Sequence, residues 1–209
     1  MAESYILHED PRSGNCHKIA LTAALLGIPL ERKQYDIVKG ETRTPEFIAS
    51  VNANGRIPVL QIDGEAGTRF LPESNAACFY LADGSPLIPQ DRFGRADMLR
   101  WMFFEQYNHE PNVATLRFWL YFVGEANLSQ QQRDQIMAKR IAGEAALQLM
   151  DEHLAKHDWF VGGGPTLADV ALYPYTSASE AGGFALQDFR HICCWLERFE
   201  ADPGFLLMA

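Results

Sequence analysis

The feature that most constrains the fold is a change of hydrophobic pattern partway along the chain. Over residues 1–82, short apolar runs typical of strands alternate with segments of helical periodicity. The stretch 83–91 is rich in turn residues, and from Arg92 onward the sequence predicts only helices, separated by Gly and Pro. We therefore expect two domains of different class, one over 1–82 and an all-helical one over 91–209, joined by a linker at 83–90.

The first part of the chain also predicts an order of elements. The expected elements are strand 5–8, helix 16–27, strand 30–37, a helix that begins at Pro45 with Thr44 as its cap, strands 57–62 and 68–71 joined by a turn at Asp63-Gly64, and a helix that begins near Ser74. Because helices cross between the early strands, the sheet should be mixed and flanked by helices. The order β-α-β-α-β-β-α is that of an α/β, thioredoxin-like domain, and the later half should be an all-α helical bundle.

Charge and hydropathy narrow the function classes. The 209 residues include 27 acidic and 18 basic side chains, which give a net charge of −9. This balance argues against nucleic-acid binding, because that binding relies on Lys and Arg to neutralise phosphates. No run of about 18 apolar residues could span a bilayer, and the N-terminus carries no secretory signal pattern. We therefore expect a soluble, cytoplasmic protein with no nucleic-acid or membrane partner.

The cysteines predict neither a disulfide framework nor a metal site. They are Cys16, Cys78, Cys193 and Cys194, two of them adjacent and none in a CxxC pair. Zinc knuckles and small disulfide-bonded domains need paired spacings that this chain lacks. We expect four reduced thiols and no bound metal.

The segment NGRIPVL (54–60) places a proline where a strand begins. At this point of a thioredoxin-like domain, such a proline usually follows a cis peptide bond, which costs about 0.5–1 kcal/mol relative to trans. The turn would leave the backbone N–H and C=O of Ile57 available to an extended peptide. The other interpretation is a trans Pro58 that simply starts the strand.

The segment PESNAA (72–77) places Glu73 and Ser74 at the start of a helix. There, the N–H and hydroxyl of Ser74 can hold a carboxylate against the positive end of the helix dipole. Glu73 beside it can take an ammonium group, so a ligand with a free α-amino acid end suits this pair. The alternative is an ordinary serine cap with no ligand.

The stretch RSGNCHKI (12–19) holds several polar or reactive groups at the start of the first predicted helix. Thiol oxidoreductases of this fold carry a CxxC pair here, but in this chain Ser13 stands at the first position. A hydroxyl at a helix N-terminus can donate to a thiolate supplied from outside. Together with the dipole it lowers the pKa of that thiol from its free value of about 8.5. His17 is expected on the helix surface.

A fourth feature, Thr166-x-x-Asp169 within GGPTLADVALYPY (163–175), predicts a capping box that starts a helix and does no chemistry. With the opening stretch, the proline turn and the Glu73-Ser74 pair, it completes a set of motifs that resembles the cytosolic glutathione S-transferase family, of a bacterial serine- or asparagine-type, theta-like or related class. The resemblance covers nearly the whole chain. It implies glutathione as co-substrate, a hydrophobic electrophile as second substrate, no metal, and a homodimer of two-domain subunits.

The resemblance also implies roles for single residues. In serine-type members the residue at the position of Ser13 activates the glutathione thiol, and another branch uses the residue at the position of Asn15. A third branch forms mixed disulfides through a cysteine, for which Cys16 must be considered. We expect Ser13 to act, before Asn15 and then Cys16. The residues expected to bind the rest of glutathione are Lys39, Thr42, Arg43, Arg56, Ile57, Pro58, Glu73 and Ser74, with Arg43 as main donor to the glycine carboxylate.

The segment 98–122 concentrates eight aromatic residues. Such a stripe more often forms core or an interface than a pocket, but in the resembled family the start of the helical domain lines the electrophile site. The residues expected there are Phe104, Tyr107, Asn108, His109 and Trp119, which interrupt the apolar periodicity or follow a helix end at Pro111. Arg117 has two interpretations, an ion pair with Glu105 or Glu110, or a contact with an anionic ligand.

Three functions remain open on the sequence. The first is a glutathione transferase that ionises the glutathione thiol at Ser13 and presents it to an electrophile, with most of the rate gain from thiolate formation and positioning. The second is a glutathione-dependent disulfide or peroxide reductase, favoured if Asn15 or Cys16 contacts the sulfur. The third is a weakly catalytic module that binds glutathione or a hydrophobic ligand.

Overall fold

The computed structural model describes residues 3–208, which divide into two compact units. One unit comprises residues 3–85 together with 202–208, and the other comprises Pro86–Ala201. The chain therefore passes from one unit to the other between Ser85 and Pro86. The assignment of 202–208 to the first unit differs from the expected helical domain over 91–209, whose last residue lies outside the described part, as do residues 1 and 2 of the expected first domain.

The first unit is built on a mixed four-stranded sheet. Its strands are β1 (Ser4–Glu9), β2 (Leu30–Gln34), β3 (Val59–Gly64) and β4 (Gly67–Pro72), in the order β2-β1-β3-β4. β1 pairs with β2 in parallel and with β3 antiparallel, and β3 pairs with β4 antiparallel. The mixed sheet that the sequence predicts is therefore present.

The hairpin between β3 and β4 turns two residues later than expected. The predicted turn at Asp63-Gly64 is wrong, because Gly64 is still paired, with Gly67, and the two residues between them form the loop. Gly67 has φ +87°, a conformation that glycine adopts without a Cβ penalty. The Asp63 side chain is instead used across the hairpin, where it accepts a hydrogen bond from Thr68 Oγ1 at 2.6 Å.

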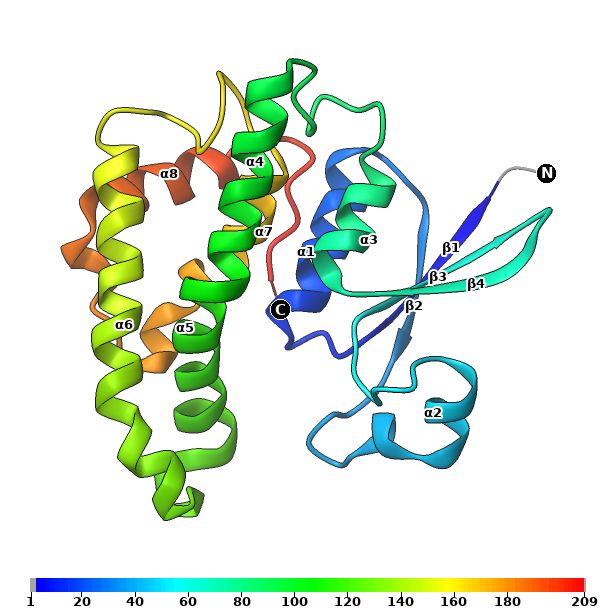
Figure 1. Ribbon diagram of the computed structural model, residues 1–209, viewed down its shortest axis with the longest axis horizontal. Coiled ribbons are helices and arrows are strands. Elements are labelled where there is room, and N and C mark those ends of the chain that lie inside the picture. Colours follow the sequence, from blue (N-terminus) through cyan, green and yellow to red (C-terminus); the bar gives the residue numbers. More distant parts are fainter. Residues whose placement is uncertain (1–2, 209) are drawn as a thin grey trace. The chain divides into compact units, whose positions relative to one another are not determined.

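Among the described residues, three α-helices accompany the sheet at the positions that the sequence predicts. They are α1 (Gly14–Leu25), α2 (Pro45–Ser50) and α3 (Ser74–Leu81), and Thr44 caps α2 as expected, through its side chain. α1 and α3 pack against each other and lie beside the sheet, whereas α2 stands apart from them (Figure 1). The core of this unit includes Leu7, Ile19, Leu21, Val59, Leu60, Ile62, Ala77, Cys78 and Leu81.

The segment 202–208 runs beside α1, coloured red in Figure 1. The backbone of Leu206 hydrogen-bonds His17, and a Cβ on Gly204 would lie 3.2 Å from the Leu25 Cα. His17 is only 4% exposed, so the prediction that it lies on the helix surface is wrong. The periodicity of α1 cannot show this, because the covering segment comes from the far end of the chain. Burial also lowers the pKa of His17 to about 4.

The second unit is helical throughout, as the sequence predicts from Arg92 onward. Its α-helices are α4 (Arg92–Phe104), α5 (Glu110–Arg117), α6 (Gln130–Leu154), α7 (Leu167–Ser177) and α8 (Arg190–Glu200). Large buried side chains fill its core, among them Met98, Trp101, Phe160, Tyr173, Trp195 and Phe199. None of the helices among residues 3–208 combines the length and the apolar character needed to cross a membrane.

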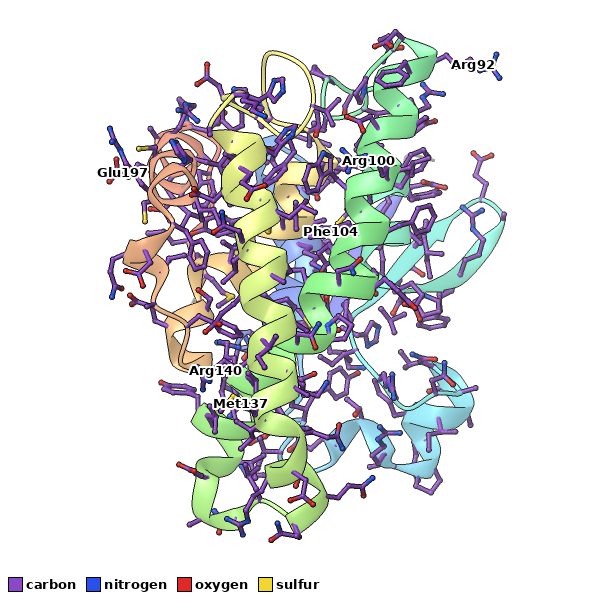
Figure 2. All side chains as sticks on the ribbon, turned by 60° about the vertical axis from the view of Figure 1, so that its left-hand side comes forward. Arg92, Arg100, Phe104, Met137, Arg140 and Glu197 are labelled. Atoms are coloured by element: carbon purple, nitrogen blue, oxygen red, sulfur yellow. The ribbon has the colours of Figure 1, made fainter. Side chains whose placement is uncertain are left out.

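A π-helical turn over Glu105–His109 joins α4 directly to α5. The expected helix end at Pro111 is therefore wrong. Pro111 stands in the first turn of α5, directly after the π-helical turn, and has no backbone N–H to donate to the preceding turn. Turns of this kind occur mostly as single insertions and often at functional sites. Figure 2 marks Phe104, the last residue of α4 before the turn.

Candidate functional site

Ser13 forms the N-cap of α1. Its backbone is extended, with φ −84° and ψ 121°, and its N–H donates to the Asp10 carbonyl at 2.9 Å. The Ser13 Oγ accepts from the Cys16 N–H at 3.4 Å, a long and weak cap bond. The side chain is half-buried. A hydroxyl that accepts one bond can still donate its own proton, so Ser13 meets the requirement of the predicted role.

Asn15 connects the N-termini of two helices. Its Oδ1 accepts from Lys18 Nζ at 2.8 Å within α1 and from Ser74 Oγ at 3.4 Å at the start of α3. The sequence motifs suggest these residues separately, and only the fold shows that Asn15 and Ser74 meet. The positive ends of α1 and α3 therefore lie close together, which favours an anion near them.

Cys16 is buried, with no exposed surface. Burial raises the pKa of its thiol to about 12, although a hydrogen bond with Ser13 acts in the opposite direction. A thiol with this pKa is protonated at neutral pH and cannot act as a nucleophile. The catalytic role considered for Cys16 therefore lacks structural support, because the third position of α1 faces the core.

The proline turn adopts the predicted geometry. The Ile57–Pro58 peptide bond is cis, so the trans interpretation is wrong. Pro58 is buried and Ile57 is half-buried. Among the described residues, the backbone N–H and C=O of Ile57 have no hydrogen-bond partner. They remain available to an extended peptide, as the sequence suggests.

Glu73 has an unusual backbone conformation. Its φ is +71°, and it is the one residue other than glycine with positive φ in the described chain. Such a conformation costs about 1–3 kcal/mol and is concentrated at ligand clamps and active sites. Glu73 takes the N-cap position of α3 without a side-chain cap bond, and Ser74 is the first helical residue. The interpretation of Ser74 as an ordinary cap is therefore wrong, because its hydroxyl bonds to Asn15 instead.

The segment 39–43 is tied to the loop before the proline turn. The Thr42 hydroxyl donates to the Gly55 carbonyl at 3.0 Å, and Arg43 Nη1 donates to the Asn54 carbonyl at 2.9 Å. Thr42 is buried and holds this loop, and its predicted contact with glutathione stays a prediction. Arg43 is exposed and keeps further donors, whereas Lys39 forms an ion pair with Asp36 at 3.4 Å. Arg56 is exposed.

Sequence analysis missed an arginine-centred network directly before Ser13. Arg12 donates to Asp10 through Nε at 2.9 Å and Nη2 at 2.6 Å, and Nη2 also reaches Asp36 at 2.9 Å. Asp10 additionally accepts from the Ile37 N–H at 3.2 Å. The Arg12 hydrogen bond lowers the pKa of Asp36 to about 2. The sequence signal was an acidic residue directly after the first strand, followed closely by an arginine.

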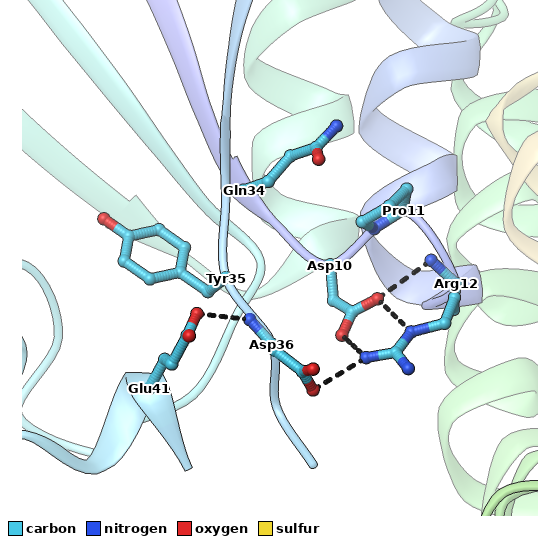
Figure 3. Close-up of a pocket in the computed structure, with 7 residues that line it drawn as sticks. All are labelled: Asp10, Pro11, Arg12, Gln34, Tyr35, Asp36 and Glu41. Carbon is cyan, nitrogen blue, oxygen red and sulfur yellow. Dashed lines mark hydrogen bonds and ion pairs between the residues drawn. The ribbon is translucent and has the colours of Figure 1, made fainter. Parts of the chain in front are cut away.

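This network borders a pocket of about 260 Å³ (Figure 3). The pocket is lined by Asp10, Pro11, Arg12, Gln34, Tyr35, Asp36 and Glu41. Figure 3 shows Arg12 between the two aspartates, with Glu41 bonded to the backbone of Asp36. The arginine thus holds the chain after β2 against the entry to α1.

The site residues predicted in the helical unit differ in their exposure to solvent. Tyr107 and Asn108 are exposed, and Phe104 and Trp119 are half-buried. His109 has no exposed surface and its Nε2 lies 3.0 Å from Thr176 Oγ1 on α7, so it differs from the expected ligand-facing residue and belongs to the core. Its position at the end of a π-helical turn, which shifts the helix register, explains the difference.

Arg117 is also buried, and its guanidinium lies 4.9 Å from the centre of the Phe122 ring. Burial lowers its pKa. The contact is a cation–π interaction, which is stronger where water is excluded. The ion pair and the anionic ligand that the sequence suggests for Arg117 both stay predictions.

Two family models match most of the chain. The model described as "Glutathione S-transferase, N-terminal domain" matches residues 12–83, and "Glutathione S-transferase, C-terminal domain" matches residues 112–203. A solved glutathione S-transferase from Pseudomonas fluorescens Pf-5 is 40% identical, with a TM-score of 0.89 and 98% of both chains covered. The chain belongs to the glutathione S-transferase family. The thioredoxin-like fold with a helical second domain is thereby confirmed.

Other members of the family show its range. "Glutathione S-transferase 2" of Anopheles gambiae is 28% identical over 200 residues, 93% of this chain and 90% of that protein. A glutathione transferase from Burkholderia graminis, 29% identical with a TM-score of 0.82, covers 96% of this chain and 85% of its own, and was solved with two glutathione molecules per subunit. "Transcriptional regulator URE2" of Saccharomyces cerevisiae is 25% identical over 239 residues, 98% of this chain and 67% of that protein.

The polar clusters that the structure describes give no metal site. Within residues 3–208, no group of three or more His, Cys, Asp or Glu side chains could hold a metal ion. The four cysteines are all free thiols, and Cys194 is the exposed one among them.

Proposed function

We propose that this protein binds glutathione in its first unit, ionises the glutathione thiol at the start of α1, and transfers it to a hydrophobic electrophile. The single observation that carries the proposal is the contact between Asn15 and Ser74. It brings together the N-termini of α1 and α3, of 12 and 8 residues. Two dipoles of this sign favour a thiolate and a carboxylate beside them.

The other half of the ligand fits the remaining features. A γ-glutamyl end carries a carboxylate and an ammonium group, which suit Ser74 and the exposed Glu73. The strained φ of Glu73 supports a ligand role, because such conformations persist where a binding site needs them. The unpaired backbone groups of Ile57 suit the cysteinyl part of the tripeptide. The exposed guanidinium of Arg43 suits the glycine carboxylate, with Lys39 and Arg56 as neighbours.

Ser13 and Asn15 remain the candidates for the thiol donor. Both are half-buried at the cap and second position of α1, and both side chains can donate. The burial of Cys16 argues against mixed-disulfide chemistry through this residue. The transferase is therefore favoured over a reductase that would use Cys16.

We further propose that the exposed residues Tyr107 and Asn108, with Phe104 and Trp119, bind the electrophile. They stand at or near a π-helical turn and offer aromatic surface with one polar amide. Tyr107→Ala should raise KM for 1-chloro-2,4-dinitrobenzene without changing the bound glutathione thiol pKa. The matched control is Leu149→Ala, at an exposed apolar residue on α6. Equal effects of the two substitutions would contradict the assignment.

We also propose that the protein acts in the cytoplasm as a homodimer, as the family resemblance implies. The exposed rings of Phe93 and Phe103, 79% and 71% exposed on α4, supply apolar surface for a partner copy. Sedimentation at micromolar concentration should give twice the monomer mass. A monomer at all concentrations would contradict the dimer.

The test of the proposed function is glutathione binding followed by thiolate absorbance against pH. A transferase should bind glutathione, show a thiol pKa below the free value, and conjugate 1-chloro-2,4-dinitrobenzene. The relative called a transcriptional regulator favours a second candidate, a glutathione-binding module with little catalysis. Tight binding with an unshifted thiol pKa and negligible turnover on several electrophiles would support that second function.

A further inference from the structure

Lys18 is a buried lysine in the second turn of α1. Its side chain has no exposed surface, and its Nζ donates to Asn15 Oδ1 at 2.8 Å. Fully buried lysines are rare, because removing an ammonium group from water is costly unless partners compensate it. Lys18 therefore places a buried ammonium group in direct contact with a candidate thiol donor.

The contact fixes the orientation of the Asn15 amide. An ammonium group has three donors and no acceptor, so the amide atom that faces it must be the oxygen. The hydroxyl of Ser74 does not determine the amide orientation, since it can donate to an oxygen or accept from an NH2 group. Of these two contacts, only the one with Lys18 requires the amide oxygen. It therefore leaves the Asn15 NH2 group on the opposite side of the amide.

We propose that Lys18 is a positioning residue that holds Asn15 with its NH2 donors presented to the glutathione sulfur. This inference rests on the proposed function, because it places glutathione at the start of α1. With the amide turned the other way, Asn15 would direct a carbonyl oxygen at the thiolate and repel it. Lys18 thus makes Asn15 a donor instead of an acceptor.

The charge of Lys18 acts in the same direction as this orientation. The hydrogen bond also polarises the amide and strengthens its NH2 as a donor. Both effects are lost together when the ammonium group is removed.

The test compares Lys18→Met with Lys18→Arg, which keeps a charged donor without an acceptor. Lys18→Met should raise the pKa of bound glutathione by about one unit and lower kcat/KM about tenfold at pH 6.5, with the deficit closing as the pH approaches 9. Lys18→Arg should keep a low thiol pKa. Lys156→Met, an exposed lysine after α6, is the matched control and should change neither quantity.

Action through Asn15 is tested by the same substitution in an Asn15→Ala background. There, Lys18→Met should shift the thiol pKa by less than half as much as in the wild type. An equal shift in both backgrounds, or no shift in either, would overturn the proposal. If circular dichroism shows that Lys18→Met is unfolded, Lys18→Gln replaces it with the same expectations.

The two proposals fail in different ways. If wild-type protein binds no glutathione, or binds it with an unshifted thiol pKa, the proposed function is wrong. If the wild-type thiol pKa is lowered and Lys18→Met leaves it lowered, the proposed function stands and the role of Lys18 is wrong.

Discussion

The helices α7 and α1 both begin with a hydroxyl side chain as N-cap, but the two caps differ in how many hydrogen bonds they form. At α7, the Thr166 cap and Asp169 form a capping box, and Asp169 has no exposed surface. Asp169 accepts from the Thr166 N–H at 2.8 Å, Thr166 Oγ1 at 3.0 Å, Phe160 N–H at 3.3 Å and Trp195 Nε1 at 3.0 Å. At α1, the Ser13 cap makes one weak bond of 3.4 Å and its side chain is half-buried.

The difference distinguishes a helix start that stabilises the fold from the one that we propose binds a ligand. The oxygens of Asp169 in the α7 box accept hydrogen bonds from four groups of the protein, so they have little capacity to bind a ligand. The cap at α1 is weakly satisfied and neighbours Asn15, whose oxygen joins two helices. Unfilled hydrogen-bonding capacity at a helix N-terminus is what an anionic ligand needs.

The largest expected effect is on the α7 box. Asp169→Ala should lower the free energy of unfolding by about 4 kcal/mol, because several buried donors lose their acceptor. Urea unfolding followed by circular dichroism measures this loss. Asp158→Ala is the control, since that side chain is 78% exposed and should change stability little. Similar small losses for both variants would erase the contrast between the two helix starts.

A smaller effect concerns His17, on the face of α1 that 202–208 covers. The folded state keeps His17 neutral with a pKa of about 4, whereas the unfolded chain binds a proton near pH 6.5. Lower pH therefore favours unfolding, and stability should fall by about 2 kcal/mol between pH 6.5 and 5 through this group. His17→Gln should remove that part of the pH dependence, measured by urea unfolding at both pH values. His157→Gln, at an exposed histidine, should leave it intact.

Local sequence signals predicted much of the fold but not this side of α1. The cap at Thr44, the cis peptide bond before Pro58 and the box at Thr166 each depend on a few neighbouring residues, and all are present. The burial of His17 depends on a segment some 190 residues away, and that of His109 on a register shift and on Thr176. The apolar periodicity of a helix cannot predict long-range packing of this kind.

The sequence named residues of the candidate site one by one, but it did not predict which of them contact each other. The motifs named Ser13, Asn15 and Ser74 because each stands at a helix start. They could not show that the Asn15 oxygen faces Lys18 and Ser74, since this depends on how α1 packs on α3. The Arg12 network was missed for the same reason, because Asp36 approaches only after the sheet forms.

Cys16→Ala sharpens the comparison within α1 itself. The substitution should cost about 1 kcal/mol of stability through lost burial, while kcat/KM with glutathione stays within about twofold of wild type. Steady-state kinetics and urea unfolding on the same preparation give both numbers. Cys194→Ala, at the exposed cysteine, controls for nonspecific loss of a thiol. A tenfold drop in activity for Cys16→Ala alone would restore the mixed-disulfide hypothesis.

The smallest effect is expected for stability in Ser13→Ala. A cap substitution usually costs about 0.5–2 kcal/mol, and the 3.4 Å bond here places the loss near the lower end. Thr166→Ala, the corresponding change at α7, should cost clearly more. Equal losses in urea unfolding would show that the α1 cap is as fully used for folding as the α7 box.

The most direct test of the central claim is the pKa of glutathione bound to the wild type, Ser13→Ala and Asn15→Ala, measured by thiolate absorbance. The start of α1 should hold the bound thiol below its free pKa of about 8.5, and at least one of the two substitutions should return it by one unit or more. The substitution that does so identifies the donor. A bound thiol with the free pKa in the wild type would contradict the account.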